Sequence, residues 1–165
     1  MSLSDVPKGT NTYIDANIFL FIAFKEKHFE ESKDFLKRVH KKEVNGFISI
    51  VVLDEVLFKL IQAEASVTFK IPLHATVQFL KKNPDKIQEL TKCWNALEKI
   101  LSLNITILDA PKDFRLVMNI CKEYKLMTRD ALHVSVMKSN GITHITTGDE
   151  DFKGVPGVTV WTPVR

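Results

Sequence analysis

The sequence predicts an α/β fold with a largely parallel sheet. Five short apolar segments have the length and composition of strands, at residues 11–14, 47–49, 105–108, 144–146 and 158–161. Segments with helical spacing of their apolar residues separate these strands. Strands that alternate with helices indicate parallel pairing, because each helix returns the chain to the same end of the sheet.

The amino-terminal part begins with the strand at 11–14 and a short helix at 17–23. A second helix at 30–41 places apolar residues on one side and lysines on another. Gly46 then breaks the helical pattern before the second strand. From Val51 onward the apolar spacing is helical again.

A helical segment at about 66–103 fills the middle of the chain. Residues 66–82 predict one helix, either whole or broken near Pro72, and Pro84 ends it. Residues 85–101 predict a single long amphipathic helix that leads to the third strand.

Two helices are predicted between the third and the fourth strand. After the third strand, Asp109 and the proline that follows predict the start of a helix that runs to about Tyr124. Asp109 is therefore interpreted as a plain helix cap. Thr128 is predicted to cap a helix through Asn140, which Gly141 ends.

Length and composition predict one globular domain over residues 1–165. The 45% hydrophobic and 26% charged content is that of an ordinary folded protein. The longest apolar stretch, at 18–24, is too short to cross a bilayer and lacks the basic flank of a signal peptide. These observations predict a cytoplasmic protein with no membrane partner. Cys93 and Cys121 have no metal-site spacing and are expected to be buried free thiols.

The net charge of +3 is compatible with a polyanionic partner without demonstrating one. Basic residues cluster at two places where they could contact phosphate groups, and Lys-rich helix faces are also often simply solvated. The candidates are Lys33, Lys37, Arg38, Lys41 and Lys42 on one helix and Lys81 and Lys82 before Pro84.

Acidic residues at the ends of separate elements suggest a carboxylate cluster. Asp15 and Asp149 directly follow strands, and in parallel sheets ligands bind beyond the carboxyl ends of the strands. Asp130 lies in the first turn of a helix, and Glu55 or Asp54 lies one turn inside another. Clustered carboxylates repel one another, so such clusters hold a divalent cation or keep some members protonated.

Each acid also has a structural interpretation. Asp15 could cap the helix that follows it, and Asp130 could interact with its own helix dipole. Asn17 could orient Asp15, contact the metal or serve as a cap. Asp149 is preferred over Asp151 because it is nearer to the strand end. His133 is interpreted as a packed helical residue rather than a general base.

Four segments in order resemble the PIN-domain nucleases, and most closely the small VapC-type toxin ribonucleases. They are Tyr13-Ile14-Asp15-Ala16-Asn17, the segment from Ser49 to Glu55, Asp130-Ala131-Leu132-His133, and the segment from Thr147 to Phe152. The resemblance implies a three-layer α/β/α sandwich with a mainly parallel central sheet. It also implies that carboxylates bind Mg²⁺ or Mn²⁺ and that the protein hydrolyses RNA.

Residue roles follow from the same resemblance. The implied catalytic and metal-binding acids are Asp15, Glu55, Asp130 and Asp149, which selects Glu55 over Asp54. Asp151 is expected to bind metal through water, Thr147 to support the site or contact phosphate, and Arg129 to contact phosphate.

The leading hypothesis is a metal-dependent endoribonuclease that acts as the toxin of a toxin–antitoxin pair. Exposed apolar helices make a homodimer a further expectation. Hard oxygen ligands suit Mg²⁺ or Mn²⁺ better than zinc. One alternative is a non-catalytic RNA-binding or scaffold domain in which the acids serve as caps. Another is a nuclease acting on DNA or on structured substrates.

Overall fold

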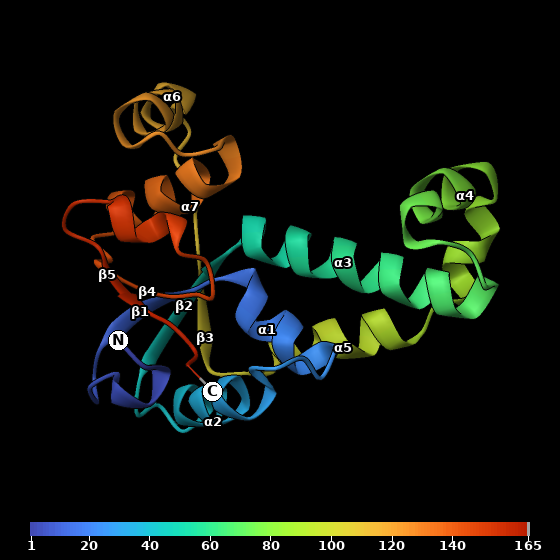
Figure 1. Ribbon diagram of the computed structural model, residues 1–165, viewed down its shortest axis with the longest axis horizontal. Helices are drawn as coiled ribbons and strands as arrows, with labels where there is room; N and C mark the ends of the chain where they lie inside the picture. Colours follow the sequence, from blue (N-terminus) through green and yellow to red (C-terminus); the bar gives the residue numbers. More distant parts are fainter. Residues whose placement is uncertain (165) are drawn as a thin grey trace.

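The computed structural model describes residues 1–164 and contains a five-stranded parallel sheet (Figure 1). The strands are β1 (Asn11–Ile14), β2 (Asn45–Ser49), β3 (Ile105–Leu108), β4 (His144–Thr146) and β5 (Thr159–Trp161). Their spatial order is β3-β2-β1-β4-β5. Both neighbours of β1 are parallel to it, with Thr12 opposite Gly46 of β2 and opposite His144 of β4. The predicted parallel α/β fold is confirmed.

Helices form a layer on each side of the sheet. Within residues 1–164 the α-helices are α1 (Ala16–Ala23), α2 (Phe29–His40), α3 (Ile50–Phe69), α4 (Thr76–Lys82), α5 (Lys92–Leu101), α6 (Phe114–Tyr124) and α7 (Thr128–Ser139). The chain moves in one direction from β1 to β3 and then returns across the sheet to β4. Because such crossovers are right-handed, α6 and α7 lie on the opposite side of the strands from α1, α2 and α5 (Figure 1).

Close packing between the layers explains individual residue choices. A Cβ atom added at Gly46 would lie 2.6 Å from Val39 Cγ1 and 2.9 Å from Ile14 Cδ1. Glycine therefore lets α2 approach β2 across the core. Among residues 1–164, no helix combines the length and apolar character that crossing a bilayer requires.

The middle of the chain forms an arm that projects from the sheet (Figure 1). Helix α3 is 20 residues long, so it extends about 30 Å. Two short 3₁₀ helices (Leu73–Ala75 and Pro84–Glu89) and α4 fold around its far end, where the rings of Phe69 and Phe79 lie 5.1 Å apart. Helix α5 then returns along α3 to the sheet. Of the two alternatives that the sequence left open at 66–82, the structure shows the helix broken near Pro72.

Three predictions about helix boundaries are wrong. The single helix expected at 85–101 is a 3₁₀ helix followed by α5, because the chain is extended at Leu90 and a new helix starts at Lys92. Asp109 caps no helix. Asp113 does so, accepting a hydrogen bond of 2.9 Å from the amide of Arg115. Thr128 is the first helical residue of α7 rather than its cap.

The two cysteines differ in burial. Cys93 is buried as predicted, whereas Cys121 is only half-buried, because it lies on α6, the outer of the two paired helices. Both are free thiols. Burial and the neighbouring Glu64 raise the pKa of Cys93 to about 11, so this thiol stays protonated.

Candidate metal centre

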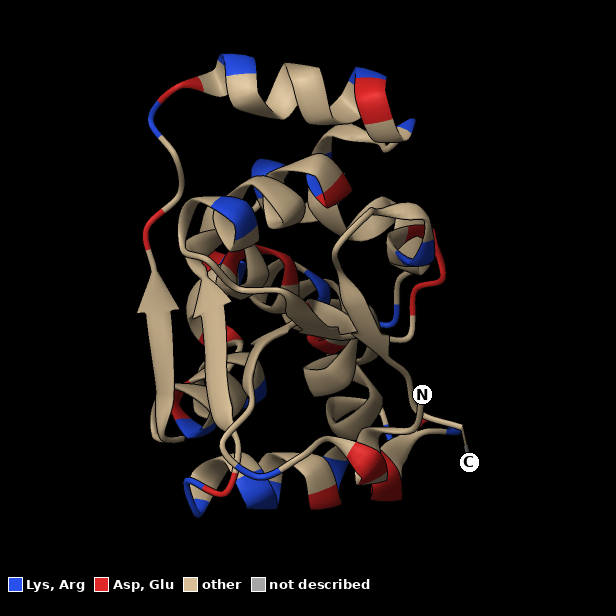
Figure 2. Cartoon of the chain, turned by 90° about the vertical axis from the view of Figure 1, so that its left-hand side faces the viewer, with Lys and Arg blue, Asp and Glu red and all other residues tan. Residues whose placement is uncertain are grey.

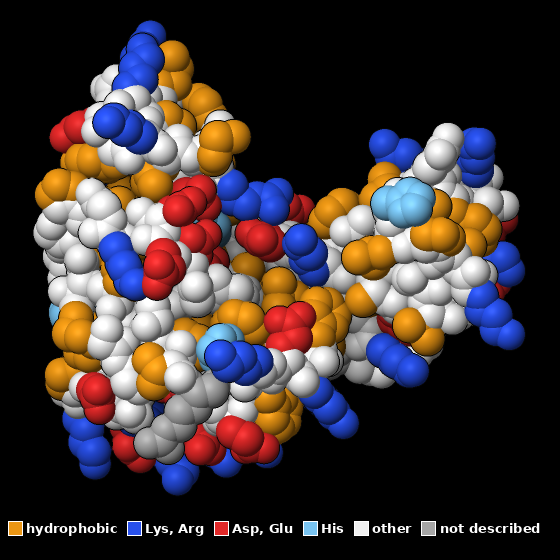
Figure 3. Space-filling view, in the orientation of Figure 1, with side chains coloured by type: hydrophobic (Ala, Val, Ile, Leu, Met, Phe, Trp, Pro, Cys, Tyr) orange, Lys and Arg blue, Asp and Glu red, His pale blue; other side chains and the backbone are white. Residues whose placement is uncertain are grey.

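The candidate site lies where the strand order reverses, between β1 and β4. Successive strands after β1 are added on one side and β4 is added on the other. The connections that leave these two strands diverge, and ligands bind at such a switch point. Asp15 immediately follows β1, and Thr147, Gly148 and Asp149 immediately follow β4. The recess between α6 and the arm, visible in Figure 3, contains acidic and basic side chains at its base.

Asp15 has a defined partner for each carboxylate oxygen. Its Oδ1 accepts a 2.6 Å hydrogen bond from the Ala16 amide and caps α1. Its Oδ2 accepts 2.6 Å hydrogen bonds from Thr147 Oγ1 and from Asn17 Nδ2. The side chain is only 7% exposed. These contacts fix its orientation toward the end of β4.

Thr147 and Asn17 join the β1 end to the β4 end. Thr147 Oγ1 accepts hydrogen bonds from Asn17 Nδ2 at 3.0 Å and from the Asp149 amide at 2.9 Å. Asn17 Oδ1 accepts one from the Gly148 amide at 3.0 Å. Both residues therefore contact Asp15 and connect the end of β1 to the end of β4.

The pKa values show that five carboxylates share one electrostatic environment. Burial, followed by the charges of Asp149, Asp151, Asp15 and Glu55, raises the pKa of Asp130 to about 6. Burial also raises the pKa of Asp15. The hydrogen bonds from Thr147 and Ala16 oppose that rise, and the charge of Asp149 adds to it. The acids from separate elements are thus close enough to disfavour one another's ionisation.

Glu55 is directed toward α7 and Asp54 is exposed. Glu55 Oε2 lies 3.5 Å from Nη1 of Arg129, and the Glu55 side chain is 20% exposed. Its charge also acts on Asp130. Helical spacing alone left the choice between Glu55 and Asp54 open, and contact with α7 distinguishes them.

The donor set is composed of oxygen atoms, which fits Mg²⁺ or Mn²⁺. In the part of the chain that the structure describes, no three His, Cys, Asp or Glu side chains are placed to enclose a metal ion without moving. Asp151 is exposed, and its amide donates a 2.9 Å hydrogen bond to Asp149 Oδ1. The carboxylates therefore converge on one region without forming a closed cage.

A buried polar network beside the acids was not anticipated from the sequence. The hydroxyl of Tyr13 lies 2.6 Å from Ser49 Oγ and 2.9 Å from Nδ1 of His133. His133 is 2% exposed, and burial lowers its pKa to about 4. The interpretation of His133 as a packed residue is confirmed. Tyr13 resembles any core residue of an apolar strand, so no local signal distinguishes it.

Apart from Arg129 on α7, the basic residues predicted to contact phosphate lie on α2, directly after it, or at the end of α4, and none of these segments carries a candidate acid. Arg38 donates hydrogen bonds to the carbonyl groups of Leu3, Ser4 and Val6, so it is engaged in holding the amino-terminal segment. Lys37 pairs with Asp34 at 2.8 Å. Figure 2 shows acidic residues among the basic ones along α2, the helix at its lower edge.

Comparisons with known proteins agree with this arrangement. The PIN domain family model matches residues 12–158. The chain is 32% identical over 145 residues to Ribonuclease VapC2 of Methanocaldococcus jannaschii. The alignment covers 87% of this chain and 87% of that protein.

Two solved structures share the fold. A chain of VapBC2 from Rickettsia felis, bound to a DNA fragment from the promoter, aligns with a TM-score of 0.62 and 16% identity over 93% of this chain and 98% of that one. A chain of a toxin–antitoxin complex from Klebsiella pneumoniae aligns with a TM-score of 0.51 and 19% identity over 93% and 98%. From the family match and the shared architecture, this chain belongs to the PIN-domain family.

Proposed function

We propose that this protein is a cytoplasmic, metal-dependent endoribonuclease and the toxin of a toxin–antitoxin pair. The observation that carries the proposal is the convergence of five carboxylates at the switch point, where burial and the charges of Asp149, Asp151, Asp15 and Glu55 raise the pKa of Asp130 to about 6. The similarity to a ribonuclease over 87% of the chain supports RNA as the substrate.

The proposed ligands of Mg²⁺ or Mn²⁺ are Asp15, Glu55, Asp130 and Asp149, with Asp151 acting through water. A bound cation would lower the pKa of a water molecule and neutralise charge on the phosphodiester. The other carboxylates have to move toward Asp15 to bind it. Thr147 and Asn17 hold Asp15 in its orientation through their hydrogen bonds to Oδ2.

Arg129 is the proposed phosphate contact. Its side chain is 50% exposed and its guanidinium pairs with Glu55 at 3.5 Å. If Glu55 turned toward a cation, the guanidinium would be released to interact with the substrate. Arginine suits this role because its planar group can donate two parallel hydrogen bonds to a phosphate.

The test compares the parent protein with Asp15→Asn, Asp130→Asn and Asp149→Asn variants, each close to isosteric. Single-stranded RNA and DNA are incubated with Mg²⁺, with Mn²⁺ and with chelator. We expect RNA cleavage by the parent alone, at least 100-fold slower in each variant and abolished by chelator. Asp54→Asn is the matched control, since Asp54 neighbours Glu55 and is exposed.

Other outcomes identify the alternatives. RNA binding without cleavage under every metal condition would establish a non-catalytic scaffold. Preferential cleavage of DNA or of branched substrates would establish a different nuclease. Full activity in Asp15→Asn would exclude the proposed site.

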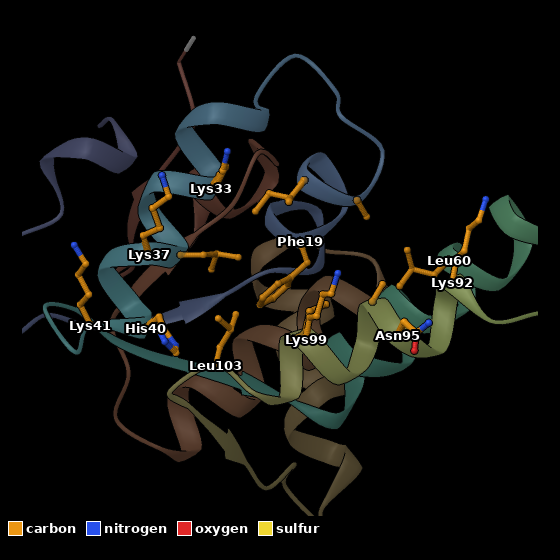
Figure 4. Close-up of a pocket in the computed structure, with 15 residues that line it drawn as sticks. Phe19, Lys33, Lys37, His40, Lys41, Leu60, Lys92, Asn95, Lys99 and Leu103 are labelled. Carbon is orange, nitrogen blue, oxygen red and sulfur yellow. The ribbon is translucent and has the colours of Figure 1, made fainter.

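We further propose that an antitoxin protein binds in a groove between α1, α2, α3 and α5 (Figure 4). The groove has a volume of about 780 Å³ and an apolar floor formed by residues that include Phe19, Ile22, Leu36, Leu60, Ile100 and Leu103. Its rim carries Lys33, Lys37, Lys41, Lys92 and Lys99, and no acidic side chain lines it among the described residues. This combination suits an amphipathic segment with acidic flanks.

Charge reversal tests the groove. Lys37→Glu combined with Lys99→Glu should weaken the binding of a labelled acidic amphipathic peptide at least tenfold in fluorescence anisotropy at low salt. Lys125→Glu, which lies outside the groove, is the control. Equal binding by all three proteins would remove the groove from consideration.

We also propose a homodimer through the exposed face of α6. Phe114 and Met118 are four residues apart and therefore share a face, and they are 53% and 48% exposed. Light scattering should show a dimer that Phe114→Asp converts to a monomer. A monomeric parent at high concentration would contradict this.

A further inference from the structure

Tyr13, Ser49 and His133 form a continuous hydrogen-bonded network inside the core. The Tyr13 hydroxyl is the central member, 2.6 Å from Ser49 Oγ and 2.9 Å from His133 Nδ1. Tyr13 and Ser49 are fully buried, and His133 is 2% exposed. The network therefore lies out of the reach of solvent.

Each member lies only a few residues along the chain from one of the candidate acids. Tyr13 lies on β1 two residues before Asp15. Ser49 ends β2 and is the N-cap residue of α3, the helix that contains Glu55. His133 lies on α7, three residues after Asp130 and thus one turn along the same face.

The acids and the network act in opposite directions on these elements. Like charges on the carboxylates of Asp15, Glu55 and Asp130 repel one another, which favours separation of β1, α3 and α7. Apolar contacts between the elements are not directional and tolerate small shifts. Hydrogen bonds weaken steeply with distance and angle, and a buried polar group left without its partner is costly.

We propose that Tyr13, Ser49 and His133 are positioning residues that set the spacing of the carboxylates for cation binding. The inference rests on the proposed metal-dependent function. The Tyr13 hydroxyl holds β1 against both α3 and α7, so the acids on these three elements keep one arrangement. A satisfied buried network specifies a unique packing in a way that an apolar contact does not.

Tyr13→Phe is the main test, because it removes the hydroxyl and keeps the ring. We expect Mn²⁺ affinity, measured by isothermal titration calorimetry, to fall about tenfold, and the Mn²⁺ concentration for half-maximal RNA cleavage to rise by the same factor. Cleavage at saturating Mn²⁺ should stay close to the parent value, since the acids themselves are unchanged.

Tyr124→Phe is the matched control. Tyr124 is the second tyrosine of the chain, and its hydroxyl accepts a 2.6 Å hydrogen bond from Lys138 Nζ on the exposed side of α6 and α7. This variant should bind Mn²⁺ like the parent. Ser49→Ala removes one of the two hydrogen bonds of the Tyr13 hydroxyl and should lower the Mn²⁺ affinity about threefold. If Tyr13→Phe does not fold, Ser49→Ala alone tests the inference.

The outcomes separate this inference from the proposed function. If the parent binds Mn²⁺ and Tyr13→Phe and Ser49→Ala bind it equally well while unfolding at lower temperature, the network is merely structural and the inference is wrong. If the parent neither binds Mn²⁺ nor cleaves RNA, the proposed function fails, and the inference fails with it.

Discussion

Asp15 illustrates how one residue satisfies two interpretations. As a cap, it uses Oδ1 to accept the Ala16 amide at the start of α1. In the proposed metal site it would use Oδ2, which accepts hydrogen bonds from Thr147 after β4 and from Asn17 on α1. A carboxylate has several acceptor positions, so these roles do not compete.

Asp130 predicts a dependence of stability on pH. Its pKa is about 6 in the folded protein and near its ordinary value of 3.8 when unfolded, so the folded state binds the proton more tightly. The contribution of this group to stability is complete below pH 4 and is lost as the pH rises through 6. In chelator at pH 7.5, Asp130→Asn should therefore be more stable than the parent, by about 1 kcal/mol once solvent screening is allowed for.

Urea denaturation at pH 4 and pH 7.5 measures this effect. The two proteins should have equal stability at pH 4, while Asp54→Asn should match the parent at both values. A variant that is less stable than the parent at pH 7.5 would contradict the shifted pKa.

At the scale of the elements, Glu64 determines where α5 begins. From α3, its carboxylate accepts hydrogen bonds from the amides of Thr91, Lys92 and Cys93 at 2.9, 3.0 and 2.7 Å. These amides are the free donors of a new helix. This long-range cap allows a new helix to begin within the apolar pattern at 85–101. It also fixes the start of α5 against α3.

Removal of the cap should loosen the arm. Glu64→Ala leaves three amides without their acceptor, so we expect a loss of about 1–3 kcal/mol in unfolding free energy. Hydrogen exchange should accelerate at residues 91–93 before it does in the sheet. Glu89→Ala is the control, because Glu89 pairs with Lys86 on the exposed surface and such pairs contribute little. Equal effects of the two variants would show that Glu64 does not support α5.

At the scale of the whole molecule, the sheet topology assembles the site. The reversal of strand order beside β1 places the ends of β1 and β4 next to each other, although Asp15 and Thr147 are 132 residues apart in the chain. Helices α3 and α7 add Glu55 and Asp130. The fold thus concentrates negative charge that destabilises it in the absence of a cation.

Divalent cations should therefore stabilise the folded protein. At a Mn²⁺ concentration 100-fold above the dissociation constant, binding adds about 2.7 kcal/mol, which corresponds to a rise of about 5–10 °C in Tm. Differential scanning fluorimetry with Mn²⁺, with chelator and with NaCl at equal ionic strength measures it. The rise should disappear in Asp15→Asn with Asp149→Asn, and an equal rise in NaCl would show general screening instead.

The sequence alone determined the α/β class, the positions of the strands along the chain, and the fact that Asp15 and Asp149 follow two of them. These properties depend on local hydrophobic patterns and on which residues follow each strand. Both are features of neighbouring residues in the sequence. A break near Pro72 was one of two alternatives for residues 66–82 for the same reason, since proline acts on its immediate neighbours.

Only the tertiary structure decided which side chains meet. The Glu64 cap spans 27 to 29 residues, and the Tyr13 hydroxyl joins partners 36 and 120 residues away. The prediction of one helix at 85–101 was wrong. The helical spacing of its apolar residues is real, but the Glu64 carboxylate, which is distant in the sequence, caps a new helix at residues 91–93. Contacts of this kind depend on how α3, α5 and α7 pack. A local sequence pattern does not identify the distant hydrogen-bond partner of a buried polar group.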